Sequence, residues 1–160
     1  MSKAKDIYIY QVEDANEKMK IVEEVLLDLP DWFGIESSTK AYIEASRDLT
    51  VFAAKFESDI LGFLTVKETS ADAVELYCMG VKEKMHKQGI GSMLFRAYEA
   101  NAIGQYKFMH VKTVDEGLYP EYDGTIRFYE RMGFTRLEVI PNLWGEENPC
   151  LILVKGVPSS

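Results

Sequence analysis

The stretch KMHKQGIGSMLF, Lys84 to Phe95, places two glycines one residue apart immediately before a run with the apolar spacing of a helix. Glycine weakens a helix interior, but it lets the backbone bend sharply or come close to another group. A helix start presents N–H groups that lack intrahelical acceptors, together with the positive end of the helix dipole. The stretch therefore predicts a turn into a helix that binds an anion, such as a phosphate, on its backbone.

The bulk composition predicts one globular domain without a membrane segment. The chain has 160 residues, of which 47% are hydrophobic and 28% charged, as is typical of soluble globular proteins. No apolar run is long enough to span a bilayer, and the N-terminal MSKAKDIYIY lacks the apolar core of a signal peptide. We expect a single domain over residues 1–156, a short tail over 157–160 and a cytoplasmic location.

The net charge indicates which kind of partner to expect, and the cysteines indicate the state of the thiols. A net charge of -8 argues against general affinity for nucleic acid and suits a cationic partner such as an amine. Cys78 and Cys150 lie in apolar, strand-like runs and form no CxxC pair, so we expect reduced thiols. No set of histidines, cysteines and carboxylates has the spacing of metal ligands, so we expect no metal.

Hydrophobic periodicity predicts strands and helices in an order that suits a mixed α/β sheet. The first helix follows an Asp14–Glu17 capping box, and a turn at Glu57–Ser58–Asp59 joins two strands into a hairpin. The predicted strands are Ile7–Val12, Thr50–Phe56, Ile60–Glu68, Val74–Val81, Tyr106–Val114, Phe134–Ile140 and Cys150–Lys155. The predicted helices are Ala15–Leu29, a short one within Ser38–Ala45, Ile90 to about Gly104, and about Thr125–Met132, the last after an acidic loop at Asp115–Gly124.

The strand, glycine turn, helix and strand around Gly89 predict a parallel, right-handed crossover. Helices then cover both faces of the sheet, and ligands bind at the carboxyl ends of its strands, where the glycines lie. The glycines match neither the GxGxxG of dinucleotide-binding folds nor the GxxxxGK of a Walker A loop. A tight turn without any ligand remains an alternative on these residues alone.

Two longer segments resemble the GNAT superfamily of N-acetyltransferases. VELYCMGVKEKMHKQGIGSMLF is similar to the family's acetyl-coenzyme A motif, Gln/Arg-x-x-Gly-x-Gly/Ala after a strand that ends in Val. DGTIRFYERMGFTRLEVI, Asp123 to Ile140, is similar to the second signature, a helix with FYxxxGF that runs into a strand. The resemblance implies a GNAT-like, mostly antiparallel sheet of about seven strands, with a central parallel pair splayed at the cofactor site.

The resemblance also implies which residues hold acetyl-CoA. The backbone N–H groups of Gln88, Gly89, Ile90, Gly91 and Ser92 would cradle the pyrophosphate. Met79 and Val81 would pair with the pantetheine amides, and the Met79 N–H would point at the thioester oxygen, with Gly80 easing a local bulge. The chain departs from the family at His86 (usually Gln or Arg), at Lys87 (often Gly) and at Tyr122 (often Asn). His86 can still donate one hydrogen bond, and Lys84 and Lys87 can supply positive charge.

For catalysis, the resemblance implies that Tyr129 protonates the departing thiolate and that Glu75 takes the amine proton, usually through water. A phenol with a pKa of about 10 is protonated at neutral pH, and an alkylammonium of similar pKa needs a base before it can attack. The alternatives are that Tyr129 only packs beside Phe128 in the core, and that Glu75 is a solvent-facing strand residue.

Other residues have weaker claims. The acidic loop with Tyr119 and Tyr122 would suit a cationic acceptor, but it also reads as a solvated loop. Trp32, Phe33 and Tyr42 lie in a region that lines the acceptor side in relatives, although such residues are more often core. Cys78 has no nearby base, and His110 lies on an apolar strand face.

We therefore predict a cytoplasmic N-acetyltransferase that moves the acetyl group of acetyl-CoA directly to a primary amine of a small molecule or peptide, without a metal or a covalent enzyme intermediate. The net charge favours a small, cationic acceptor. Three alternatives stay open: another acyl group, a water relay in place of Glu75, and a catalytically silent acyl-CoA-binding sensor or interaction module. The acceptor amine is not defined by the sequence, and a homodimer is common among relatives.

Overall fold

The computed structural model describes residues 6–159 and divides them into two compact units. Unit 1 holds the described residues up to Lys67 together with Leu76–Asn101, and unit 2 holds Glu68–Glu75 with the described residues from Ala102 onward. In unit 1 lie β1 (Ile7–Gln11), α1 (Ala15–Leu27), α2 (Glu36–Ser46), β2 (Thr50–Phe56), nearly all of β3 (Asp59–Glu68), the later part of β4 (Ala73–Val81), the 3-10 turn η2 (Glu83–Met85) and most of α3 (Ile90–Ala102). In unit 2 lie the start of β4, β5 (Phe108–Val114), α4 (Pro120–Arg131), β6 (Thr135–Ile140) and β7 (Cys150–Gly156).

Within residues 6–159, hydrogen bonds link seven strands in the order β1-β2-β3-β4-β5-β7-β6. The printed neighbours β1–β2, β2–β3, β5–β7 and β6–β7 are antiparallel, and β4–β5 is parallel. The parallel register joins Ala73–Glu75 to Phe108–His110, whereas β4 runs on to Val81 and β5 to Val114. The predicted mixed, mostly antiparallel sheet with one parallel pair is confirmed.

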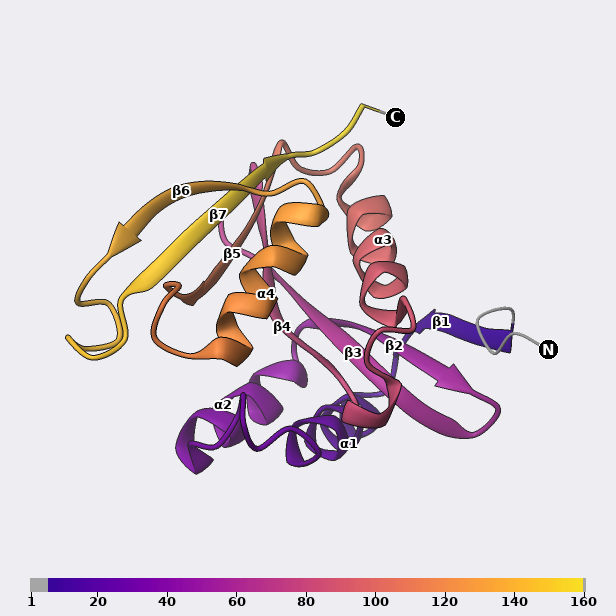
Figure 1. Cartoon of the computed structure of the whole chain (residues 1–160). Coiled ribbons are helices and arrows are strands. Elements are labelled where there is room, and N and C mark those ends of the chain that lie inside the picture. The colour runs from indigo at the N-terminus through magenta and orange to yellow at the C-terminus, as the bar shows by residue number, and fades with distance from the viewer. Residues whose placement is uncertain (1–5, 160) are drawn as a thin grey trace. The chain divides into compact units, whose positions relative to one another are not determined.

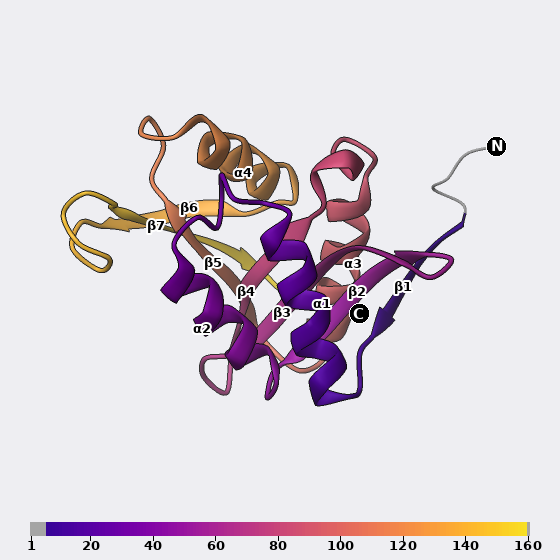
Figure 2. The ribbon, with the colours of Figure 1, turned by 90° about the horizontal axis from the view of Figure 1, so that it is seen from below.

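In unit 1, α1 is set by its cap and by its apolar stripe. The Asp14 carboxylate accepts a 2.9 Å hydrogen bond from the Glu17 N–H, so the predicted cap is confirmed. The stripe, which includes Val22 and Val25, packs on residues of β2 and β3 such as Ala53 and Phe63. Figure 2 shows α1 and α2 on one side of β2 and β3 and α3 on the other, which confirms helices on both faces in this unit.

In unit 2, α4 lies across β5 and β7 (Figure 1) and buries Ile126 and Tyr129. At its carboxyl end, the Lys155 ammonium of β7 donates a 2.8 Å hydrogen bond to the Met132 carbonyl. This contact satisfies one of the last carbonyls of the helix with a cation, where the helix dipole favours one.

The predicted extent of the last helix was wrong. The helix begins at Pro120, five residues before the predicted Thr125, so the loop is shorter than Asp115–Gly124. Proline suits the first helical position because its N–H is not needed there, and Glu121 and Asp123 place negative charge in the first turn. The sequence interpretation ended the acidic loop at Gly124, but this glycine lies inside the helix.

Candidate functional site

The turn between η2 and α3 is shaped by two residues with left-handed backbone. Lys87 has a φ of 64° and Gly89 a φ of 79°, and α3 starts at the next residue, Ile90. The Met93 N–H donates a 3.1 Å hydrogen bond to the Gly89 carbonyl, which closes the first helical turn. Ile90 is 1% exposed and anchors the start of α3 in the core.

This turn presents an open helix start to solvent. Nothing lies within 4 Å of the position where a Cβ would stand on Gly89. Lys87, Gln88 and Gly89 are exposed, and the first N–H groups of a helix have no acceptor within it. A diphosphate can therefore approach this backbone closely without meeting a side chain at Gly89, so the residues fit the pyrophosphate of coenzyme A.

His86 is held by contacts within unit 1. Its Nε2 lies 2.6 Å from the Val81 carbonyl oxygen, and its ring meets the Trp32 ring edge-on at 5.6 Å. Because a carbonyl only accepts, Nε2 carries the proton and donates it. A neutral His86 then keeps only an acceptor at Nδ1, so donation to a phosphate requires the imidazolium form.

The end of β4 is packed tightly at Gly80. A Cβ there would lie 3.0 Å from Val25 Cγ1, 3.1 Å from Leu29 Cδ1 and 3.3 Å from Phe63 Cε1, so the position favours glycine. Its neighbours Met79 and Val81, predicted to pair with pantetheine, are half-buried. Their pairing with the cofactor stays a prediction.

In unit 2, Glu75 is a buried carboxylate with a cationic partner. It is 3% exposed, and its Oε2 lies 3.4 Å from the Lys112 ammonium. The alternative that Glu75 is a solvent-facing strand residue is therefore wrong. Lys112 belongs to no recognisable sequence motif. It reaches Glu75 through the register of β4 on β5, which could not be read from the sequence.

His110 is the register partner of Glu75 in the parallel pair. Its Nε2 shares a 2.7 Å hydrogen bond with the Thr69 hydroxyl. Burial lowers the pKa of His110 below its usual 6.5, Lys112 lowers it further, and Glu75 opposes this shift. The ring is therefore neutral at pH 7, in line with the structural role expected from the sequence.

The ring of Tyr129 is part of the core of unit 2. The side chain is 7% exposed, and its ring meets Phe128 at 5.7 Å and Phe134 at 5.9 Å between centroids. The Phe134 N–H donates a 3.1 Å hydrogen bond to the Tyr129 carbonyl, which fixes the end of α4. Packing beside Phe128 is thus confirmed, and the role of Tyr129 as an acid stays a prediction.

Tyr122 lies in the first turn of α4, where its ring meets the Tyr119 ring at 5.7 Å. Burial raises the pKa of Tyr122, and the nearby Glu121 carboxylate raises it further. Tyr122 therefore keeps its proton at neutral pH. Its predicted contact with the cofactor is not decided by this geometry.

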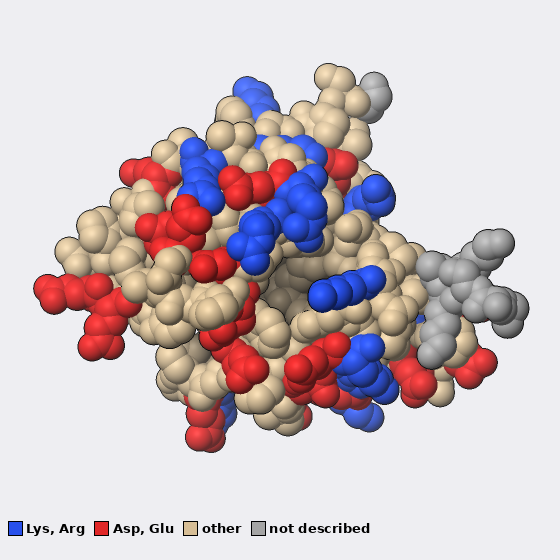
Figure 3. Space-filling model, viewed as in Figure 1, with Lys and Arg blue, Asp and Glu red and all other residues tan. Residues whose placement is uncertain are grey.

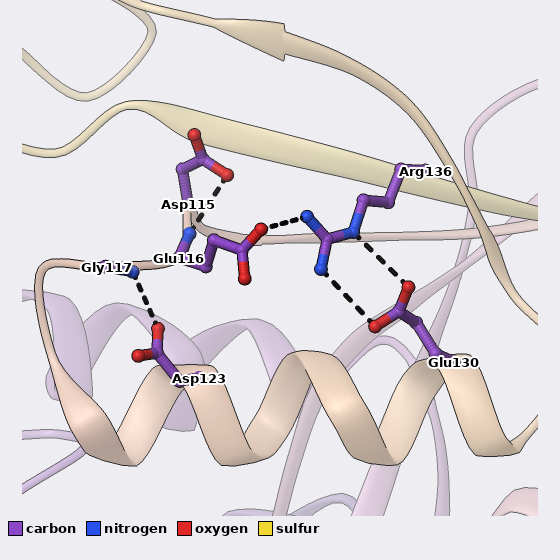
Figure 4. Close-up of polar contacts among 6 residues, drawn as sticks. All are labelled: Asp115, Glu116, Gly117, Asp123, Glu130 and Arg136. Atoms are coloured by element: carbon purple, nitrogen blue, oxygen red, sulfur yellow. Dashed lines mark hydrogen bonds and ion pairs between the residues drawn. The ribbon is translucent and has the colours of Figure 1, made fainter.

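The acidic loop of unit 2 is tied down by its own contacts (Figure 4). Arg136 of β6 forms ion pairs with Glu116 and, at 3.3 Å, with Glu130. The Arg136 guanidinium lowers the pKa of the Glu116 carboxyl. Two further carboxylates of the loop accept 2.9 Å hydrogen bonds from loop backbone N–H groups, Asp115 from Glu116 and Asp123 from Gly117.

These contacts support the reading of this segment as a structured surface loop. Figure 3 shows acidic side chains around it and at the β6–β7 turn, and basic side chains over the carboxyl end of α4. The carboxylates that the sequence offered for a cationic acceptor are largely engaged in holding the loop.

Three aromatic residues of unit 1 pack at the edge of the α1 core. Trp32, Phe33 and Tyr42 are partly buried against the cluster that includes Val25, and the Tyr42 ring meets the Tyr77 ring at 5.4 Å. The core reading of these residues is therefore supported. Any contact with an acceptor stays a prediction.

Cys78, considered as a nucleophile in the sequence analysis, is not placed to react. Cys78 is buried, and burial raises the pKa of its thiol far above the usual range. Among residues 6–159, no group of three or more histidines, cysteines and carboxylates is placed to hold a metal ion. No helix in the same range is long and apolar enough to cross a membrane.

Comparison with known proteins gives a family match and a shared fold. Residues 47–136 match the family model described as an acetyltransferase (GNAT) domain. A GNAT-family structure from Desulfovibrio desulfuricans is 15% identical with a TM-score of 0.82, and the alignment covers 95% of this chain and 99% of that one. No curated protein sequence matches the chain significantly.

Two further structures were solved with the cofactor. An aminoglycoside 6'-N-acetyltransferase in complex with coenzyme A is 19% identical with a TM-score of 0.75, over 96% of this chain and 98% of that one. An acetyltransferase from Elizabethkingia anophelis with acetyl-CoA bound is 18% identical with a TM-score of 0.68, over 94% of this chain and 98% of that one. At these identities the likeness is one of fold.

Proposed function

Because this chain belongs to the GNAT family of acetyltransferases, we propose that it binds acetyl-CoA and transfers the acetyl group directly to a primary amine. The observation that carries the proposal is the turn at Lys87–Gly89, which opens an unobstructed helix start at α3. A helix start of this kind binds phosphate through backbone N–H groups and the helix dipole. The family match supports acetyl-CoA as the source of that phosphate.

The residues that the family motif indicates have the following roles in the proposal. The N–H groups of residues 88–92 hold the pyrophosphate, with Lys87 adding charge and His86 contributing when it is protonated. Met79 and Val81 pair with the pantetheine amides, and Tyr122 contacts the cofactor. Acetyl-CoA supplies an activated thioester.

Glu75 accepts the proton of the acceptor ammonium, directly or through water, so that the amine nitrogen can form its bond to the acetyl carbon. Tyr129 donates its phenolic proton to the sulfur as the carbon–sulfur bond breaks. The acetylated nitrogen gives its second proton to water, and Glu75 and Tyr129 return to their starting states by exchanging protons with solvent. No covalent enzyme intermediate and no metal is needed. These two assignments rest on the family motif and, for Glu75, on its burial.

We further propose that the acceptor is a small cation, that the enzyme is cytoplasmic and that it acts on acetyl in preference to other acyl groups. The net charge of -8 and the buried Glu75 carboxylate support a cationic acceptor. A homodimer stays open.

The test begins with calorimetric titration of acetyl-CoA, with dephospho-CoA and ATP as controls. Binding that requires the pantetheine arm supports the proposal. Amines are then screened by the release of CoA, detected with a thiol reagent. Cys78 and Cys150 are buried, so the protein itself gives a low background in that assay. Lack of acetyl-CoA binding overturns the enzyme proposal.

A second candidate is a silent acyl-CoA-binding sensor or interaction module. The ion pair between Glu75 and Lys112 favours it, because it occupies one oxygen of the buried carboxylate in a contact that is sufficient to explain Glu75 structurally. Binding of acetyl-CoA without turnover of any amine would select this candidate.

A further inference from the structure

Glu75 needs a partner because it is ionised only at a cost when buried. Its side chain is 4% exposed, and a carboxylate removed from water is stable as an ion only beside a cation or hydrogen-bond donors. Strand β5 contains two basic residues, His110 and Lys112. They are two positions apart, so they lie on the same face of that strand. Each of them is a candidate for the cationic partner of Glu75.

His110 is not the cation. It lies opposite Glu75 in the register, but burial keeps its ring neutral at pH 7 and its Nε2 is engaged with the Thr69 hydroxyl. Burial raises the pKa of the Cys150 thiol in β7, while the nearby charge of Lys112 lowers it and that of Glu75 raises it. The thiol therefore stays uncharged at pH 7. Among these neighbours in unit 2, Lys112 bears the positive charge.

The geometry of Lys112 suits a fixed but hydrated cation. Its Nζ lies 3.4 Å from Glu75 Oε2, and its side chain is 36% exposed, so the ammonium remains in reach of water. The ion pair engages one carboxylate oxygen. We assign the other oxygen, Oε1, to proton acceptance.

We propose that Lys112 is a positioning residue for acetyl transfer, which holds Glu75 by Oε2 and leaves Oε1 to take the proton of the acceptor amine. This inference rests on the proposed function. In the silent-module alternative the ion pair with Lys112 only holds Glu75 in the structure. In this proposal the same ion pair positions Glu75 to act as the base.

The test compares Lys112→Met and Lys112→Arg with the unsubstituted protein in the CoA-release assay. A general base contributes about 10²–10⁴-fold, so we expect Lys112→Met to lower kcat by about 10–100-fold while KM for acetyl-CoA is unchanged. Lys112→Arg keeps a cation beside Oε2 and is expected to restore kcat to within a few-fold.

Two readouts separate positioning from a structural role. The defect of Lys112→Met shrinks as pH rises toward 10, because a free amine that has lost its own proton no longer needs the base. The matched control is Lys107→Met, which removes a lysine of the same unit whose side chain is 73% exposed and 3.8 Å from Asp72. We expect it to keep full kcat, and thermal melts check that each variant is folded.

The outcomes are distinct. The inference about Lys112 is overturned, and the proposed function is not, if Glu75→Gln loses turnover and Lys112→Met does not. The same holds if the defect of Lys112→Met persists unchanged at high pH. If Glu75→Gln keeps full rate, Glu75 is not the base and the inference falls with that assignment. If the unsubstituted protein binds acetyl-CoA but turns over no amine, the proposed function itself fails. Loss with methionine, rescue with arginine and recovery at high pH support the inference.

Discussion

Replacing Lys87 with glycine is expected to raise stability and weaken acetyl-CoA binding at the same time. Lys87 has a φ of 64°, a left-handed conformation that disfavours residues with a Cβ by about 1–2 kcal/mol. Glycine relieves this strain, although its extra freedom in the unfolded chain offsets about 0.5–1 kcal/mol of the gain. The net expectation is a gain of about 0.5–1 kcal/mol, which shifts the Tm of a chain this long upward by about 1–4 °C.

The affinity changes in the opposite direction because the ammonium is lost. Lys87 is exposed, so its interaction with a phosphate charge about 4 Å away in water is about 1 kcal/mol, or about fivefold in Kd. Salt screens exposed charges over about 10 Å at 0.1 M and about 3 Å at 1 M. The difference in Kd should therefore fade at high salt.

Lys87→Gln is the matched control, because it keeps the left-handed strain and removes only the charge. We expect it to leave the Tm unchanged and to weaken acetyl-CoA binding as much as Lys87→Gly does. Thermal melts and calorimetric titrations at 0.1 M and 1 M salt measure both effects. A lower Tm for Lys87→Gly, or an unchanged Kd for both variants at low salt, would refute the reasoning.

Three further predictions test other features. Gly62→Ala should lower the free energy of unfolding by about 1–3 kcal/mol, because its Cβ would stand 2.7 Å from the Gly80 carbonyl oxygen; an unchanged urea midpoint contradicts this close approach. His110 has a folded pKa below 6.5, so below that pH the unfolded chain binds the extra proton; stability is full above pH 6.5 and falls as pH drops toward the lowered value. His110→Gln should flatten that slope in denaturant titrations, and an equally steep slope assigns it to another group. Tyr129→Phe should keep the ring packing and acetyl-CoA binding but lower kcat at least about tenfold, and a full rate of CoA release means that the acid lies elsewhere.

The local signals of the sequence were sound where one short-range force decides the structure. The Asp14 carboxylate caps α1 because it accepts from an N–H three residues away, a contact written in adjacent positions. The turn after β2 is equally local, and Glu57 there has a φ of 55°. The glycine turn before α3 was predictable for the same reason.

The features that the sequence missed depend on register or on contacts across many residues. Glu75 meets Lys112 only because β4 pairs with β5 in one of several registers that alternation allows. Arg136 reaches Glu116 and Glu130 from the next strand, so the acidic loop appeared freer in the sequence than it is. The amino end of α4 was misplaced because a glycine was read as a boundary, although Pro120 was a stronger signal for a helix start.

Two of the departures from the family motif, His86 and Lys87, lie in the same loop, where we expect a preorganised anion site. The His86 Nε2–H donates a hydrogen bond to the Val81 carbonyl, which fixes the end of β4 to the turn and leaves a neutral His86 without a second donor. Lys87 accepts a strained φ where a glycine would be relaxed, and it places a cation beside the helix start. A loop held in one shape loses little entropy when a ligand binds, and a charge on it replaces the missing donor. If the site works as proposed, rigidity and charge replace the glycine and the donor of the usual motif, and the salt dependence of acetyl-CoA binding at Lys87 tests this replacement most directly.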